Sequence, residues 1–139
     1  MLKNINPLLG PELLAVLCSM GHGEDIAIVD RNYAATTAGP KVIRYEGVNA
    51  PALVDAILTV LPVDKKPEAV VRMQKTDQPD EILPVMKDFI NVFANHVPDI
   101  KVDSLTTANF KLRAARSVAI VVTGEERVYG NILVRKGVL

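Results

Sequence analysis

The sequence predicts an α/β fold, a single domain with a largely buried mixed sheet flanked by helices. Its 139 residues are the length of one domain, and 49% of them are hydrophobic, which is enough for one continuous core. Short apolar runs typical of buried strands alternate with amphipathic helical stretches along most of the chain. No repeat, low-complexity tract or linker interrupts this alternation, so residues 1–139 are expected to form one unit.

The first half of the chain holds two predicted helices and two predicted strands. One helix begins at Pro11 and ends at Gly21, because proline suits the first helical position and glycine often ends a helix. Segment 25–30 (DIAIVD) is a short apolar strand of the kind that is covered on both faces. Segment 41–46 (KVIRYE) is a second strand, and Asn49 is expected to cap the helix that follows it.

The second half continues the alternation of strands and helices. The elements expected there are a strand at 69–73, a helix around 83–96, a strand at 100–105, a helix at 107–116, and two strand-rich runs at 117–124 and 131–137. In the helix at 107–116, the side facing the core is expected to hold Phe110, Leu112 and Ala115.

The charge balance argues against a polyanionic partner. Sixteen basic and sixteen acidic side chains cancel, so a small ligand is favoured over nucleic acid or an anionic membrane surface. Cys18 is the only cysteine, which excludes an intramolecular disulfide and a zinc site of paired thiolates. Residues 1–17 make a poor signal peptide, so a cytoplasmic location is expected. The mean hydropathy of +0.21 favours a homo-oligomer, which would cover apolar surface.

His22 lies between two glycines directly after the first predicted helix. Two roles fit this position. The ring could cap the last carbonyls of the helix, as basic side chains near helix C-termini do. It could also act as a general acid or base, since histidine titrates near neutral pH, with Gly21 and Gly23 letting the backbone approach a ligand closely. The local pattern leaves both roles open.

Two further positions carry polar groups suited to a small ligand. Asp30 ends an apolar strand, where it either closes an Asx turn or faces the crevice at the carboxyl ends of the strands. Tyr129 and Asn131 flank Gly130, and this segment is either a plain hairpin turn or a set of hydrogen-bonding groups for a polyol.

Other candidate sites are weaker. His96, near the end of a predicted helix, is expected to be a cap rather than a catalyst. A metal site built from His22, His96 and scattered carboxylates lacks recognisable ligand spacing. Segment 123–130 (TGEERVYG) lacks the glycines and the lysine of a phosphate-binding loop. Neither kind of site is therefore expected.

Three blocks of the sequence resemble the family of D-ribose pyranases and L-fucose mutarotases. They are 8–30 (LLGPELLAVLCSMGHGEDIAIVD), 39–44 (GPKVIR) and 122–138 (VTGEERVYGNILVRKGV). Their order and spacing agree with the family across almost the whole chain. The GHG and YGN triplets look like the fucose branch of that family.

The resemblance implies an isomerase that interconverts the α and β anomers of a free sugar in the cytoplasm, without cofactor or metal. It also implies a ring-shaped homo-oligomer, commonly a decamer, with sites close to subunit contacts. Position by position, His22 matches the catalytic histidine of the family and Asp30 matches a substrate-binding carboxylate. Tyr129, Gly130 and Asn131 match the sugar-binding segment.

One position departs from the family pattern. Thr107 stands three residues before Phe110, where members usually carry an arginine or histidine that contacts the sugar. The leading hypothesis is therefore an L-fucose mutarotase, with a ribose pyranase-type isomerase as the alternative. A third hypothesis is a sugar-binding oligomeric module without catalysis.

The predicted spacing of the site residues raises a geometric difficulty. If 25–30 is extended at ~3.3 Å per residue, His22 and Asp30 lie at opposite ends of the strand, farther apart than one pyranose spans. The glycine turn could fold the ring back, the strand could be short, or neighbouring subunits could share the site.

Overall fold

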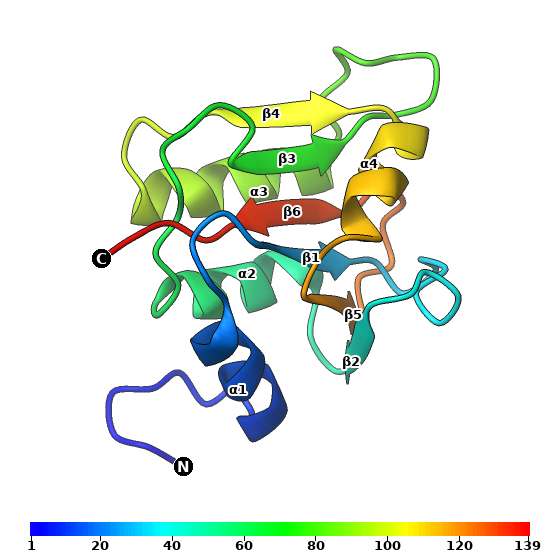
Figure 1. Cartoon of the computed structure of the whole chain (residues 1–139). Coiled ribbons are helices and arrows are strands. Elements are labelled where there is room, and N and C mark those ends of the chain that lie inside the picture. The colour runs from blue at the N-terminus through cyan, green and yellow to red at the C-terminus, as the bar shows by residue number, and fades with distance from the viewer.

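The computed structural model describes all of residues 1–139 and has a six-stranded sheet with four helices (Figure 1). The strands are β1 (Asp25–Val29), β2 (Lys41–Tyr45), β3 (Val70–Met73), β4 (Val102–Leu105), β5 (Ala119–Thr123) and β6 (Ile132–Arg135). The helices are α1 (Pro11–Ser19), α2 (Ala50–Leu58), α3 (Pro84–His96) and α4 (Thr107–Ala114). The predicted α/β class with a mixed sheet is confirmed.

The sheet has the strand order β2-β5-β1-β6-β3-β4. Pairings β1–β5, β2–β5 and β3–β4 are parallel, whereas β6 lies antiparallel between β1 and β3. All strands except β6 therefore end at the same edge of the sheet, which we call the carboxyl edge, and the loop into β6 joins them there. At the opposite edge, called the amino edge, the other strands begin and β6 ends.

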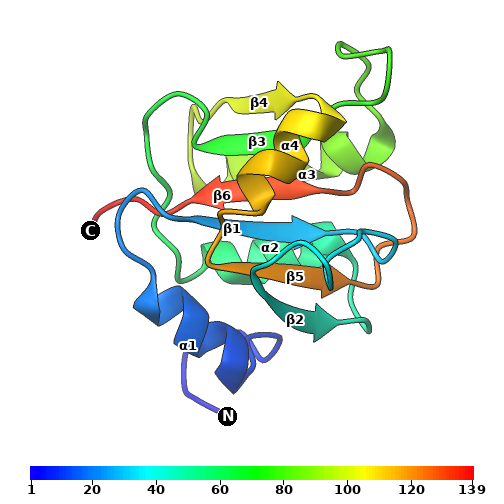
Figure 2. The ribbon, with the colours of Figure 1, turned by 45° about the vertical axis from the view of Figure 1, so that its right-hand side comes forward.

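Helices cover both faces of the sheet. Successive side chains of β1 point to opposite faces of the sheet, so they contribute in turn to the core on each face. Ile26 and Ile28 join the larger core cluster with residues of α1, α2 and α3. Ala27 and Val29 join a smaller cluster with Phe110 of α4. Figure 2 shows α4 crossing one face of the sheet and α2 lying behind it.

The predicted helix ends agree with the structure at two helices. Asn49 caps α2 as expected, with its Oδ1 accepting from the Ala52 N–H at 2.9 Å. The last residue of α1 is Ser19, Met20 is its C-cap in an extended conformation with ψ at 132°, and Gly21 follows as the first residue outside the helix. The longest helix, α3, has 13 residues, and no helix is long and apolar enough to cross a membrane.

The predicted inner side of α4 is partly wrong. Phe110 is fully buried, but Leu112 is 69% exposed and Ala115 is exposed as well. Residues two apart on a helix point in nearly opposite directions, whereas residues four apart share one face. Ala114, four residues after Phe110, therefore takes the inner position.

Candidate functional site

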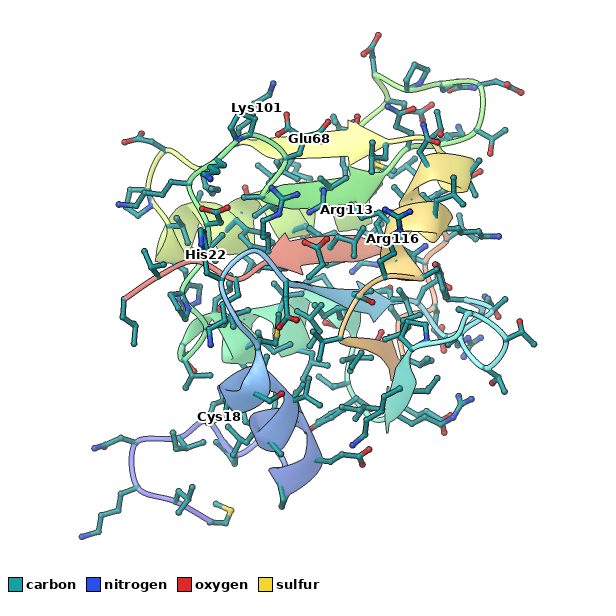
Figure 3. All side chains as sticks on the ribbon, in the orientation of Figure 1. Cys18, His22, Glu68, Lys101, Arg113 and Arg116 are labelled. Carbon is teal, nitrogen blue, oxygen red and sulfur yellow. The ribbon has the colours of Figure 1, made fainter.

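His22 lies at the amino edge, in the short turn between α1 and β1 (Figure 3). Gly23 has a φ of +88°, which glycine adopts readily and other residues rarely do. Its N–H donates to the Lys136 carbonyl at 3.0 Å. The His22 side chain is 47% exposed. The capping role falls to another residue, because the Lys136 ammonium donates to the Met20 carbonyl at the end of α1.

The His22 ring faces the carboxylate of Asp64. His22 Nε2 lies 3.6 Å from Asp64 Oδ1, and the Asp64 side chain is only 10% exposed. Asp64 Oδ1 also accepts from the Lys65 N–H at 2.8 Å. Burial raises the pKa of the Asp64 carboxyl, but the N–H groups of Lys65 and Lys66 and the contact with His22 outweigh burial and hold this pKa below its ordinary value. Asp64 is therefore an anion at neutral pH.

Asp30 and Asn131 meet at the carboxyl edge. The Asp30 N–H donates to Asn131 Oδ1 at 2.8 Å, joining the end of β1 to the start of β6. Asp30 is 6% exposed and its Oδ1 accepts from the Asn32 N–H at 2.9 Å, so the Asx turn, one of the two roles predicted for this residue, is present. Burial raises the pKa of the Asp30 carboxyl despite these hydrogen bonds.

Tyr129 is held in an unusual backbone conformation beside Asn131. Its φ is +64°, in the left-handed region that bulky residues rarely adopt, and such positions concentrate at functional sites. The Tyr129 hydroxyl donates to Thr76 Oγ1 at 3.1 Å and accepts from the Thr76 N–H at 3.3 Å. These two hydrogen bonds lower the pKa of the Tyr129 phenol.

An ion pair between the buried Glu125 and the partly exposed Arg127 supports this loop. Glu125 is 2% exposed, and its carboxylate accepts from Arg127 Nε at 2.9 Å and from Arg127 Nη2 at 3.0 Å. Arg127 also reaches Asp88 of α3 at 2.7 Å. Gly130 packs so closely on this pair that an added Cβ would lie 2.6 Å from Glu125 Cγ. The segment 129–131 is therefore held on a rigid support.

Thr107 lines a hollow at the same edge. It is the first residue of α4, with Thr106 as the helix cap. The hollow measures about 360 Å³, and its walls include Thr76, the partner of Tyr129. This volume falls within the range of roughly 300–1,000 Å³ found for small-molecule sites.

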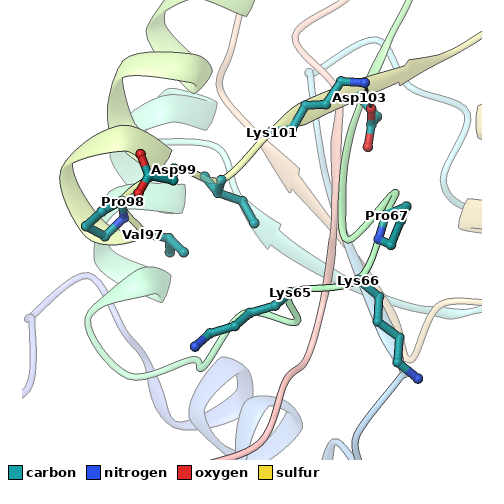
Figure 4. A pocket seen from close by; sticks show the side chains of 9 residues that line it. Lys65, Lys66, Pro67, Val97, Pro98, Asp99, Lys101 and Asp103 are labelled. Carbon is teal, nitrogen blue, oxygen red and sulfur yellow. Dashed lines mark ion pairs between the residues drawn. The ribbon is translucent and has the colours of Figure 1, made fainter.

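A larger hollow of about 550 Å³ lies at the amino edge (Figure 4). Lys65, Lys66 and Lys101 lie around it, and Lys101 pairs with Asp103 at 3.0 Å. It contains none of the residues predicted to bind sugar. No group of three or more His, Cys, Asp or Glu side chains lies close enough to hold a metal ion.

The structure gathers most predicted site residues but leaves His22 apart. Asp30, Asn131, Tyr129, Gly130 and Thr107 lie at the carboxyl edge, whereas His22 lies beyond the other end of β1. The five residues of β1 alone span about 16 Å.

The His96 side chain contacts neither His22 nor the site residues at the carboxyl edge. Its Nε2 lies 2.7 Å from Asp55 Oδ1, which ties the end of α3 to α2. This contact with Asp55, rather than a helix cap alone, holds the His96 side chain in place.

Sequence reasoning missed three residues of these sites. Asp64, Thr76 and Glu125 lie in polar segments that resemble solvated loops, and no local pattern marks them. One weak signal exists for Asp64, because it follows an apolar helix and precedes a pair of lysines near a buried strand.

Known proteins of the same fold bind or act on sugars. Residues 3–139 match the model of the RbsD / FucU transport protein family. The chain is 35% identical to fucose mutarotase from Streptococcus pneumoniae, solved in complex with L-fucose, with a TM-score of 0.92 and 99% of each chain covered. It is 30% identical to FucU from Bifidobacterium longum, again with a TM-score of 0.92 and 99% of each chain covered.

A more distant structure shares the fold alone. RbsD from Bacillus subtilis, solved with D-ribose, is 22% identical, with a TM-score of 0.77 over 100% of this chain and 99% of that one. The family match spans nearly the whole sequence, and two solved structures at 30% identity or more cover it almost completely. On this evidence the chain belongs to the RbsD/FucU family.

Proposed function

We propose that this protein is a mutarotase that interconverts the α and β anomers of L-fucose. The observation that carries the proposal is the 35% identity, over 99% of both chains, with a fucose mutarotase whose structure holds L-fucose. The polar groups gathered at the carboxyl edge support it, because Asp30, Tyr129 and Asn131 are hydrogen-bonding side chains suited to sugar hydroxyls.

Anomer exchange needs proton transfers, the reversible breaking of one carbon–oxygen bond, and a rotation. A proton reaches the ring oxygen as another leaves the anomeric hydroxyl, and the bond between C1 and the ring oxygen breaks to give an open-chain carbonyl. The carbonyl group then turns over, and the same carbon–oxygen bond forms again as the ring closes. No carbon–carbon or carbon–hydrogen bond breaks. General acid–base catalysis, which contributes roughly 10²–10⁴-fold, is therefore sufficient for a useful enzyme without a cofactor.

In this proposal His22 carries the proton and the carboxyl edge binds the sugar. Asp30, Tyr129, Gly130, Asn131 and Thr107 form the binding side. The second proton carrier is Tyr129 or a bound water. The lowered pKa of the Tyr129 phenol supports Tyr129 in this role, because it makes the loss of its proton easier.

A ring-shaped homo-oligomer, such as the decamer that the family resemblance implies, would complete the site. It would bring the amino edge of one subunit against the carboxyl edge of the next, since head-to-tail contacts close into rings. Ile82 and Val128, in loops at the carboxyl edge, are 47% and 62% exposed and would be covered by such a contact. We propose a cytoplasmic location for this assembly, as in the family.

Saturation transfer between the anomeric protons of L-fucose tests the proposal. Irradiating one anomer should reduce the signal of the other much faster with the protein than in buffer. D-Ribose and D-galactose serve as comparison sugars. An exchange rate equal to that of buffer for all three sugars would show that the protein is not a mutarotase.

Thr107 favours a second candidate, a ribose pyranase-type isomerase. A threonine in place of the usual basic side chain removes one positive charge from the sugar side of the site. The same experiment on D-ribose separates the two candidates, because a pyranase would speed exchange between pyranose and furanose signals. A strong preference for L-fucose would remove this alternative.

A sugar-binding module without catalysis is the third candidate, and the transport function in the family's description favours it. Calorimetry would then show sugar binding, while His22→Ala would leave anomer exchange unchanged.

A further inference from the structure

We infer that Lys75 is a sugar-binding residue whose ammonium group donates a hydrogen bond to a sugar hydroxyl at the carboxyl edge. The inference rests on the proposed function, in which this edge binds the sugar. Lys75 belongs to the loop between β3 and α3, which lies beside the start of α4 in Figures 1 and 2. It lines the hollow of about 360 Å³ together with Thr76 and Thr107.

Lys75 is the only basic residue that lines this hollow. The wall formed by α4 and its cap is uncharged, with Thr106, Thr107 and Ala108, and the only carboxylate is that of Asp77. The oxygens of sugar hydroxyls accept hydrogen bonds, and a bond from a charged donor is about twice as strong as one between neutral groups. The positive charge available to a sugar here therefore comes from the loop rather than from the helix.

The Lys75 ammonium has a donor left for a ligand. Nζ donates to Glu81 Oε2 at 3.0 Å and to Gln78 Oε1 at 3.3 Å. An ammonium group has three N–H donors, so these two contacts leave one without a partner. The side chain is 32% exposed, which leaves it open to a ligand. Its two partners hold the long side chain in place, so less side-chain entropy is lost when a sugar binds.

The loop that carries Lys75 is anchored on both sides of this residue. Before it, the Gln74 N–H donates to the Leu105 carbonyl at the end of β4, at 2.8 Å. After it, the Pro79 carbonyl accepts from Nη2 of Arg72 at 3.1 Å, and Arg72 is only 5% exposed in β3. The backbone around Lys75 is therefore preorganised for binding.

The charge of Lys75 also acts on Tyr129, which belongs to the proposed sugar-binding side. Hydrogen bonds with Thr76 lower the pKa of the Tyr129 phenol most, and the positive charge of Lys75 lowers this pKa further, whereas Asp77 acts in the opposite direction. The interaction between charges weakens with distance, so the ammonium and the phenol lie near each other. Lys75 and Tyr129 are thus placed to contact the same sugar.

The ion pair of Lys75 with Glu81 supplies a matched control. Lys75→Gln and Glu81→Gln both break this pair, but only the first removes the positive charge from the hollow, because Glu81 does not line it. The two side chains are 32% and 38% exposed, so both variants should fold. If Lys75 only supported the loop through this pair, the two variants would behave alike.

Calorimetry with L-fucose measures the Kd, and saturation transfer measures anomer exchange at saturating sugar. We expect Lys75→Gln to raise the Kd about tenfold, as the loss of a charged hydrogen-bond donor predicts. Glu81→Gln should leave the Kd near the wild-type value, and Lys75→Arg, which keeps the charge, should keep most of the affinity. The saturated exchange rate should stay within about twofold of wild type in all three variants, because a contact made equally before and during the reaction changes binding alone.

An equal rise of the Kd in Lys75→Gln and Glu81→Gln would overturn the inference, as would an unchanged Kd in Lys75→Gln. D-Ribose and D-galactose are measured in parallel, so the comparison of the two variants uses whichever sugar binds best. If the wild type binds a sugar without speeding its exchange, the mutarotase function fails and the Kd comparison still decides on Lys75. If the wild type speeds exchange and Lys75→Gln binds as tightly, the function stands and the role of Lys75 is wrong. A wild type that binds none of the three sugars would refute both proposals.

Discussion

The two edges of the sheet are built in different ways. At the carboxyl edge, Asp30, Asn131 and Glu125 are buried and hydrogen-bonded, and a glycine packed on Glu125 holds the loop. At the amino edge, His22 is half exposed and faces its carboxylate at 3.6 Å. Binding a sugar in one orientation needs fixed groups, whereas carrying a proton needs an accessible ring. The difference suits the division of labour that we propose.

The largest effect is expected from His22→Ala. Removing the imidazole should lower anomer exchange by roughly 10²–10⁴-fold, because general acid–base catalysis contributes about that much. Since His22 is 47% exposed, the fold should remain intact. Saturation-transfer NMR measures the rate. His96→Ala is the control and should leave exchange unchanged, so equal losses in both variants would contradict the assignment.

Gly130→Ala should destabilise the loop at the carboxyl edge and weaken sugar binding there. The new Cβ would lie 2.6 Å from Glu125 Cγ, and Glu125 cannot move without breaking its pair with Arg127. We expect a loss of about 1–3 kcal/mol in the free energy of unfolding, with weaker sugar binding. Urea unfolding and calorimetry measure the two effects. Gly47→Ala, which has no atom within 4 Å of the added Cβ, should be neutral. A neutral Gly130→Ala would mean that the loop is not rigid.

Lowering the pH should reduce the free energy of unfolding, because it protonates Glu125 at the carboxyl edge. Burial raises the pKa of this carboxyl, but hydrogen bonds from Arg127 outweigh burial and set the pKa below the ordinary value of 4.5. A group with a lowered folded pKa contributes stability above its unfolded pKa and loses that contribution as pH falls through the folded pKa. Below pH 4.5 the free energy of unfolding of the wild type should therefore fall more than that of Glu125→Gln, which has no carboxylate to protonate at this position. Parallel urea unfolding curves at descending pH test this, and equal acid losses would contradict it.

Tyr129→Phe should have the smallest effect. It removes the hydroxyl that bonds Thr76 while keeping the ring, and one hydrogen bond contributes about 0.5–1.5 kcal/mol. We expect sugar affinity to fall a few-fold, measured by calorimetry. Tyr45→Phe removes a hydroxyl that accepts from the Gly10 N–H, before α1, and should not change affinity. A much larger fall in the exchange rate than in affinity would instead identify Tyr129 as the second proton carrier.

The sequence predicts the architecture better than the contacts within it. Segment 25–30 reads as a buried strand because every one of its apolar side chains faces a covered side of the sheet, and Ile26 through Val29 are indeed fully buried. Helix α4 is harder to orient, because Leu112 is apolar but exposed. Hydrophobic identity alone does not reveal which side of a short helix meets the core.

The polar groups of the candidate site were only partly predictable. Asp30 and Asn131 each stand out locally, but the hydrogen bond between them spans 101 positions and depends on the antiparallel placement of β6. Glu125 is buried while the neighbouring Glu126 is exposed, and nothing in the sequence separates two adjacent glutamates. Asp64 meets His22 only because both segments attach to the end of β6. Such pairings follow from sheet topology rather than from local pattern.

Mixing two inactive variants tests most directly whether the two edges form one site between subunits. His22→Ala keeps an intact carboxyl edge, and Asp30→Asn keeps an intact amino edge. If neighbouring subunits share the site, unfolding and refolding the two variants together in equal amounts should restore about a quarter of wild-type exchange, from random pairing of intact halves. If the mixture stays as inactive as its separate components, the shared site is wrong.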